Sequence, residues 1–174
     1  MKFLVLFFVM LSRVVFPSPL DEARILFFQF DENKQASKQM LSLLQSVNNP
    51  SPIVEAYIGV AIAAGADHEI SPIAKYRRFS EGKNLIEKAI KKLPDDAEIR
   101  MLRLSIQTAA PVFLGYRSNL EEDKKMMIEA LQSKKGSFSE TQFRAKVLIF
   151  LLEKVSLTST ERNIVNDLIN KQEK

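Results

Sequence analysis

The stretch that decides the fold is GKNLIEKAIKKLP, residues 82–94. Small and apolar residues recur in it every three or four positions, which is the spacing of one face of an α-helix. They are Gly82, Leu85, Ile86, Ala89, Ile90 and Leu93. Pro94 ends this helix because proline cannot continue the hydrogen-bond ladder, and the Asp95-Asp96-Ala97-Glu98 that follows has the pattern of a capping box. The stretch therefore predicts two consecutive helices joined by a tight turn.

The same periodicity covers most of the chain outside this stretch. Apolar stripes at helical spacing lie at residues 20–30, 36–47, 53–64, 99–109, 120–131, 147–152 and 164–169. Residues 66–79, ADHEISPIAKYRRF, contain Pro72 and no sustained period, which predicts a long loop. We therefore expect an all-α protein of about seven or eight helices, packed as antiparallel hairpins because most connections are short.

Part of this pattern resembles a known helical repeat. Gly82, Ile86, Ala89 and Pro94 stand at the mutual spacings of the small, bulky, small and helix-breaking positions in the second helix of a tetratricopeptide repeat. Ile58-Gly59 with Ile62 is similar to the first helix of the same repeat. The resemblance covers roughly residues 52–110 and amounts to one repeat.

Two features of the chain depart from the tetratricopeptide pattern. Residues 66–79 add about eleven positions to the usual spacing, and Arg100 and Arg103 stand where the family has bulky apolar residues. The resemblance implies a short right-handed bundle or solenoid of stacked hairpins, whose concave face binds a protein, peptide or ligand without catalysis. The segments 99–106 and 113–124 are also similar to uncharacterised exported helical proteins of Gram-negative bacteria, a likeness that implies no activity.

The first residues, MKFLVLFFVMLSRVVF, have the pattern of an export signal. One lysine precedes nine consecutive apolar residues at positions 3–11, too few to span a bilayer. Pro17 and Pro19 follow at once. We expect residues 1–18 to be a signal peptide, residues 19–174 to form a single helical domain, and the protein to be exported to the periplasm or secreted. The alternative is a buried N-terminal helix.

The composition removes most catalytic chemistry. There is no cysteine and one histidine, so thiolate sites, disulfides and most zinc and triad chemistry are excluded. That histidine, His68, lies in Asp67-His68-Glu69, where we expect a solvated loop rather than a metal or acid–base site. The net charge of +4 is too small for the usual footprint of a nucleic-acid binder. We therefore expect no enzymatic activity, no cofactor, no metal and no nucleic-acid partner.

Three groups of arginine and tyrosine could converge in the fold. They are Tyr76-Arg77-Arg78, the helical pair Arg100 and Arg103, and Tyr116-Arg117 with Phe113 three residues before Tyr116. If the loops 66–79 and 112–118 cover the face that carries Arg100 and Arg103, they build a pocket suited to a carboxylate or phosphate. The alternative is that the aromatic rings close hairpin ends while the arginine side chains reach solvent.

Two other charged segments have both a functional and a purely structural interpretation. Residues 75–92 hold seven basic and two acidic side chains, which could dock a lipid headgroup or acidic peptide, or simply form a solvated helix face. Glu121-Glu122-Asp123 stands in a first helical turn, where carboxylates compensate the helix dipole.

The leading hypothesis from the sequence is an exported, non-enzymatic scaffold that binds a protein or peptide partner in the cell envelope. The alternative is a binder of a small anionic ligand or lipid headgroup that uses the arginine and tyrosine pocket. The sequence leaves the oligomeric state open. It also leaves open whether residues 138–172 fill the concave face.

Overall fold

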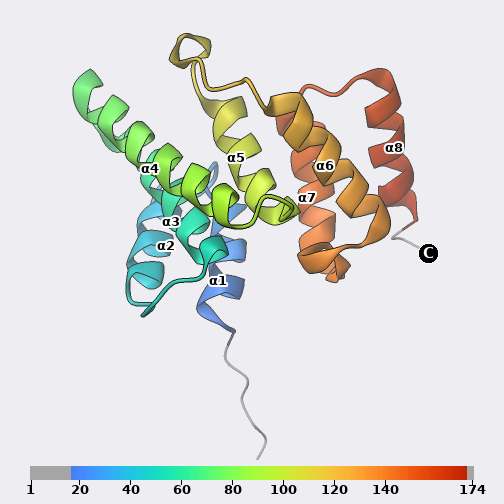
Figure 1. Cartoon of the computed structure of the whole chain (residues 1–174), viewed down its shortest axis with the longest axis horizontal. Helices are drawn as coiled ribbons and strands as arrows, with labels where there is room; N and C mark the ends of the chain where they lie inside the picture. The colour runs from blue at the N-terminus through green and yellow to red at the C-terminus, as the bar shows by residue number, and fades with distance from the viewer. Residues whose placement is uncertain (1–16, 172–174) are drawn as a thin grey trace, which may run out of the picture.

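The computed structural model of the chain describes residues 17–171, so residues 1–16 of the predicted leader lie outside the described residues. The described part is all-helical and contains no strand, which confirms the predicted fold class. Its eight α-helices are α1 (Pro19–Phe27), α2 (Ala36–Gln45), α3 (Pro52–Ala64), α4 (Pro72–Lys92), α5 (Ala97–Ala109), α6 (Leu120–Ser133), α7 (Thr141–Lys154) and α8 (Ser159–Asn170) (Figure 1). Three 3-10 turns join them: η1 (Gly65–His68), η2 (Val112–Leu114) and η3 (Gly136–Ser139).

Local sequence signals fix where the helices begin. Ser18 caps α1 in a reciprocal box with Asp21, and Thr158 caps α8 in the same way with Glu161. The Asp96 side chain accepts hydrogen bonds from two backbone N–H groups at the start of α5. Prolines occupy the first turn of α1, α3 and α4, where their missing N–H has no helical partner in any case. None of the described helices has both the length and the apolar character needed to cross a bilayer.

Helices α3 and α4 form the most closely packed hairpin. They cross where Gly59 faces Gly82, and a Cβ atom added at Gly59 would lie 2.7 Å from the carbonyl oxygen of Gly82. A Cβ atom at Gly82 would come even closer to the Gly59 carbonyl oxygen. The two backbones therefore touch directly, and no larger side chain fits at this crossing without a shift of one helix.

The expected long loop over residues 66–79 is wrong. η1 continues directly from α3, and α4 begins at Pro72, so only residues 69–71 lie outside helical turns. Pro72 was treated as a helix breaker in the sequence, but it stands in the first turn of α4, where proline is tolerated. Tyr76, Arg77 and Arg78 accordingly lie on a helix and not on a mobile connection.

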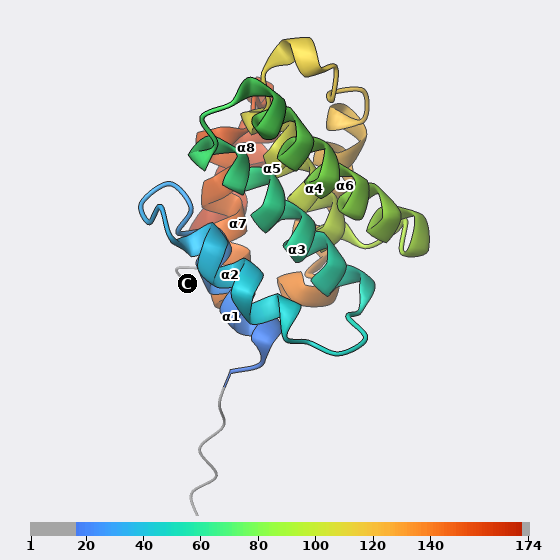
Figure 2. The same ribbon diagram turned by 90° about the vertical axis from the view of Figure 1, so that its left-hand side faces the viewer.

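The last helices pack back onto the first. The ring of Phe150 in α7 lies 6.3 Å from that of Phe27, and the ring of Phe143 lies 5.9 Å from that of Phe28. On its other side α7 reaches α6, where the Arg144 side chain donates a hydrogen bond to the Leu131 carbonyl. Residues of α7 thus belong to the same core as α1 to α6, and α7 runs behind α1 and α2 in the view of Figure 2.

Candidate functional site

The two arginines predicted to share a helical face do so, and both are buried between α5 and α6. Arg103 makes a bidentate ion pair with Asp123 of α6, through two nitrogen–oxygen contacts of 2.6 Å each. Arg100 donates to the same carboxylate at 2.9 Å and to the Pro94 carbonyl at 2.9 Å. Asp123 is 0% exposed. Bidentate arginine–carboxylate pairs are among the stronger ion pairs because two charge-assisted hydrogen bonds form at once.

Tyr116 and Glu87 extend this cluster to α4. The Tyr116 hydroxyl donates to Glu87 at 2.6 Å, and Arg103 donates to the same carboxylate at 3.2 Å. The Tyr116 ring packs edge-on against Phe79, with ring centroids 5.8 Å apart, and Lys83 lies over its face. Burial and the hydrogen bond to Glu87 raise the pKa of Tyr116 well above its ordinary value. The 111–118 connection is therefore fastened along α4.

The charges of this cluster balance within the protein. Arg100 and Arg103 face the buried Asp123, the half-buried Glu87 and the exposed Glu122, which lies 3.3 Å from Arg100. Burial alone would lower the pKa of Arg103, but its hydrogen bonds and charge interactions with these carboxylates more than offset this effect. Two guanidinium groups against three carboxylates leave no surplus of positive charge for an anion. The arrangement holds α4, α5 and α6 together.

The other predicted residues lie away from this cluster. Arg78 forms an ion pair with Glu69, and the exposed Arg117 donates to the Ala110 carbonyl at 3.1 Å. Tyr76 and Arg77 are exposed, and no hydrogen bond or ion pair joins them to another described residue. The structure thus brings Arg100, Arg103 and Tyr116 together and leaves the remaining four predicted residues outside their cluster.

A second buried ion pair, which the sequence analysis did not identify, joins α1, α3 and α5. Arg24 makes a bidentate pair with Glu98, with two contacts of 2.8 Å, and the Tyr57 hydroxyl donates to the same carboxylate at 2.8 Å. Desolvation and the nearby Glu98 charge raise the pKa of Tyr57 well above its ordinary value. Glu98 had been assigned only to the predicted capping box. Its long-range partners could not be inferred from local spacing.

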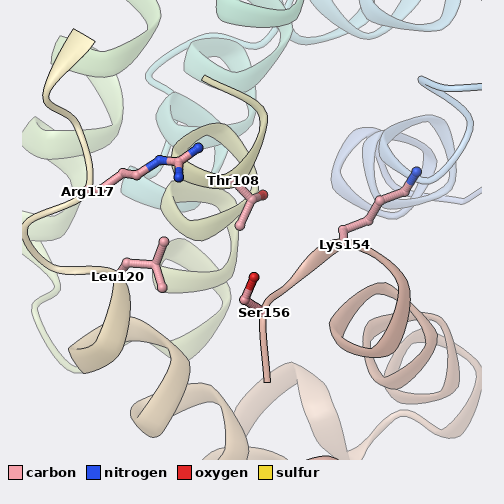
Figure 3. A pocket seen from close by; sticks show the side chains of 5 residues that line it. All are labelled: Thr108, Arg117, Leu120, Lys154 and Ser156. Carbon is pink, nitrogen blue, oxygen red and sulfur yellow. The ribbon is translucent and has the colours of Figure 1, made fainter. Parts of the chain in front are cut away.

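A small hollow lies between the end of α5, the 112–120 connection and the α7–α8 connection (Figure 3). It is lined by Thr108, Arg117, Leu120, Lys154 and Ser156 and has a volume of about 120 Å³. Ligand pockets usually have about 300–1,000 Å³, so this hollow is small for an organic ligand. The ammonium group of Lys154 points away from Arg117 and pairs with Asp31 at 2.7 Å. Within the described residues no cluster of three or more metal-ligating side chains occurs.

Large apolar side chains gather instead at one exposed end of the molecule. They come from the start of α4, from Ile70 two residues before it, and from the η2 turn, which project separately from the upper part of the molecule in both views (Figures 1 and 2). We call these five residues the apolar end, with their exposed fractions: Ile70 (99%), Phe113 (86%), Ile73 (80%), Val112 (70%) and Tyr76 (60%). Single exposed apolar residues are ordinary on protein surfaces, whereas these five are large side chains from two segments in the same part of the molecule. Of the five, the sequence analysis named only Tyr76 as a site residue.

Comparison of the chain with protein-family models, with curated proteins and with solved structures found no match to any of them.

Proposed function

We propose that this protein is a non-enzymatic helical interaction module that binds its partner through the apolar end. The observation that carries the proposal is the exposure of Ile73 and Phe113, two large apolar side chains from separate segments that the fold does not bury. Folding normally removes such side chains from water, so two exposed together at one end favour a contact made after folding. The surface thus supports binding, and nothing in it supports chemical transformation.

The hairpin architecture forms part of this proposal. We infer that α3 and α4 correspond to the two helices of a tetratricopeptide-like hairpin, as the resemblance over residues 52–110 implies. The direct approach of Gly59 and Gly82 supports this correspondence, because it lies at the small positions that the repeat uses for close packing. Such hairpins act as rigid supports for a binding surface.

The apolar end is favoured over the two sites expected from the sequence. A concave groove would need an open face, and α7 packs against both α1 and α6. An anion pocket would need free guanidinium groups, and those of Arg100 and Arg103 are engaged by Asp123 and Glu87. A protein or peptide partner, and a location in the cell envelope, stay predictions from the sequence.

Site-specific crosslinking in cells tests the proposal. A photoreactive amino acid replaces Phe113 in one protein and Lys125, an exposed residue of α6, in the matched control. We expect adducts from position 113 that position 125 does not give, and we expect Ile73→Ser to reduce them because it removes a neighbouring contact. Identical adducts from both positions, or neither protein nor lipid adducts from position 113, would contradict the proposal.

A further inference from the structure

We propose that the apolar end inserts into the surface of an anionic membrane, with the basic side chains around it at the level of the lipid headgroups. This inference rests on the proposed function, since it names the partner of the same surface. It uses residues that the sequence-based anion pocket left out, and it needs no buried arginine. Three features of the described residues carry it: the shape of the end, its chemistry and its charge.

The apolar end is built from two fastened projections. The edge-on contact of Phe79 with Tyr116 ties the 111–118 connection to α4, and the Tyr116 hydroxyl bond to Glu87 adds a second attachment. Six residues of helix separate Ile73 from Phe79, about 9 Å along the axis. The two projections therefore keep their spacing without a partner, so that little ordering is needed when they bind.

The chemistry of the projections suits a lipid surface better than a protein groove. Ile70, Ile73, Val112 and Phe113 each have at least 70% of their surface in water, so each side chain projects from its segment. A projecting apolar side chain needs a matching cavity in a protein partner, whereas lipid chains adapt to it. Tyr76 stands beside these tips, and tyrosine is enriched at the boundary between lipid and water.

Two exposed cations lie beside the apolar residues of α4. Lys75 and Arg77 are both exposed and flank Tyr76 in the first half of this helix. The Glu69 carboxylate is already paired with Arg78, while Lys75 and Arg77 have no acidic partner among the described residues. Exposed cations beside apolar tips are attracted to anionic headgroups.

Tryptophan fluorescence gives a local test. The chain has no tryptophan, so Phe113→Trp and the control Lys125→Trp each place a single reporter in the full-length protein. A local readout is needed because residues 3–11 are all apolar and can bind lipid by themselves. With vesicles containing phosphatidylglycerol, we expect a blue shift and quenching by brominated lipid at position 113, and neither at position 125.

Variants then separate the apolar and the charged contributions. In the Phe113→Trp protein, Ile73→Ser should weaken binding about tenfold, because one apolar tip no longer enters the lipid. The control Ile149→Ser changes an exposed isoleucine of α7 and should leave binding unchanged. Lys75→Gln with Arg77→Gln should weaken binding about fivefold for each charge on anionic vesicles, and should not affect the weaker binding to pure phosphatidylcholine.

The outcomes distinguish this inference from the proposed function. No response at position 113, or an equal response at positions 113 and 125, would overturn membrane insertion. If that result came with specific protein adducts in the crosslinking experiment, the interaction module would stand with a protein as its partner. If both experiments gave nothing at position 113, the module itself would be contradicted.

Discussion

The two halves of α4 differ sharply in what surrounds them. All four buried residues of this helix, Gly82, Ile86, Ala89 and Ile90, lie in its second half, which packs against α3. The first half buries none of its side chains and carries the exposed Ile73 and Tyr76. One continuous helix thus serves two purposes. Its second half is fixed by the core, and its first half is held out into solvent by that anchor.

The charged residues follow the same division. In the second half, the Glu87 carboxylate accepts hydrogen bonds from Arg103 and Tyr116, so its charge is compensated within the protein. In the first half, Lys75 and Arg77 have no acidic partner in the described part of the chain. The difference indicates that substitutions in the anchored half should affect stability. Substitutions of the exposed Ile73 and Tyr76 in the projecting half should affect binding alone.

Removal of the central carboxylate should have the largest effect. Asp123→Ala leaves Arg100 and Arg103 buried without their main partner, and breaking a buried ion pair in this way typically lowers the free energy of unfolding by about 3–5 kcal/mol. Urea unfolding followed by circular dichroism measures the change. Glu122→Ala, which removes an exposed partner of Arg100, is the control and should cost less than about 1 kcal/mol. Equal losses for the two variants would show that burial of Asp123 does not matter.

A substitution at the crossing of Gly59 and Gly82 should have the second-largest effect on stability. Gly82→Ala places a methyl group against the Gly59 backbone, which cannot move aside as a flexible side chain would. We expect a loss of about 2 kcal/mol in the free energy of unfolding, despite the better helix propensity of alanine. Thermal unfolding measures it, with Ser80→Ala in the projecting half as the control. A stabilised Gly82→Ala protein would disprove the close approach.

Tyr116→Phe should have a smaller effect at neutral pH. It removes the hydroxyl bond to Glu87 but leaves the Arg103 contact, so the expected loss is about 1 kcal/mol. Because the folded protein holds the Tyr116 proton at a pH where the unfolded chain releases it, its contribution is complete below pH of about 10 and is lost as the pH rises further. Unfolding at pH 8 and pH 11 should therefore show a shallower alkaline decline for Tyr116→Phe than for the wild type. Parallel declines would contradict the raised pKa of Tyr116.

The projecting half should give the smallest change in stability. Ile73→Ser and Phe113→Ser alter side chains that are mostly in water, so the free energy of unfolding should stay within about 0.5 kcal/mol of the wild type. The same denaturant titrations test this expectation. A loss of 2 kcal/mol or more in either variant would mean that the apolar end is part of the core, and the division of α4 would fail.

Much of the fold could be predicted from the sequence because helical periodicity is a local property. The helix predicted over residues 82–94 ends at Lys92, next to the predicted stop at Pro94, and the number of helices agrees with the upper expected value. The start of α4 was missed because Pro72 marks either the end of one element or the first turn of another. Local pattern does not distinguish these, since the projecting half has no apolar stripe facing the core.

The site was less predictable because it depends on partners far apart in the sequence. The i, i+3 spacing placed Arg100 and Arg103 on one face, and this was confirmed. Asp123 was interpreted as a carboxylate compensating a helix dipole, which its position in the first turn of α6 allows. Its contact with both arginines arises from the packing of α5 on α6, across about twenty residues. No local signal reports such packing.

Because α7 packs against α1, the first helix can be fully buried only after α7 has been synthesised. A linear array of repeats can fold from one end, because each unit needs only its neighbour. Here Phe27 and Phe28 contact Phe143 and Phe150, which a ribosome makes only after α1 to α6. Until then Tyr57 covers only part of this aromatic surface, and the rest is open to chaperones or aggregation. A chain truncated after α6 should therefore remain prone to aggregation, even when its middle hairpins have formed.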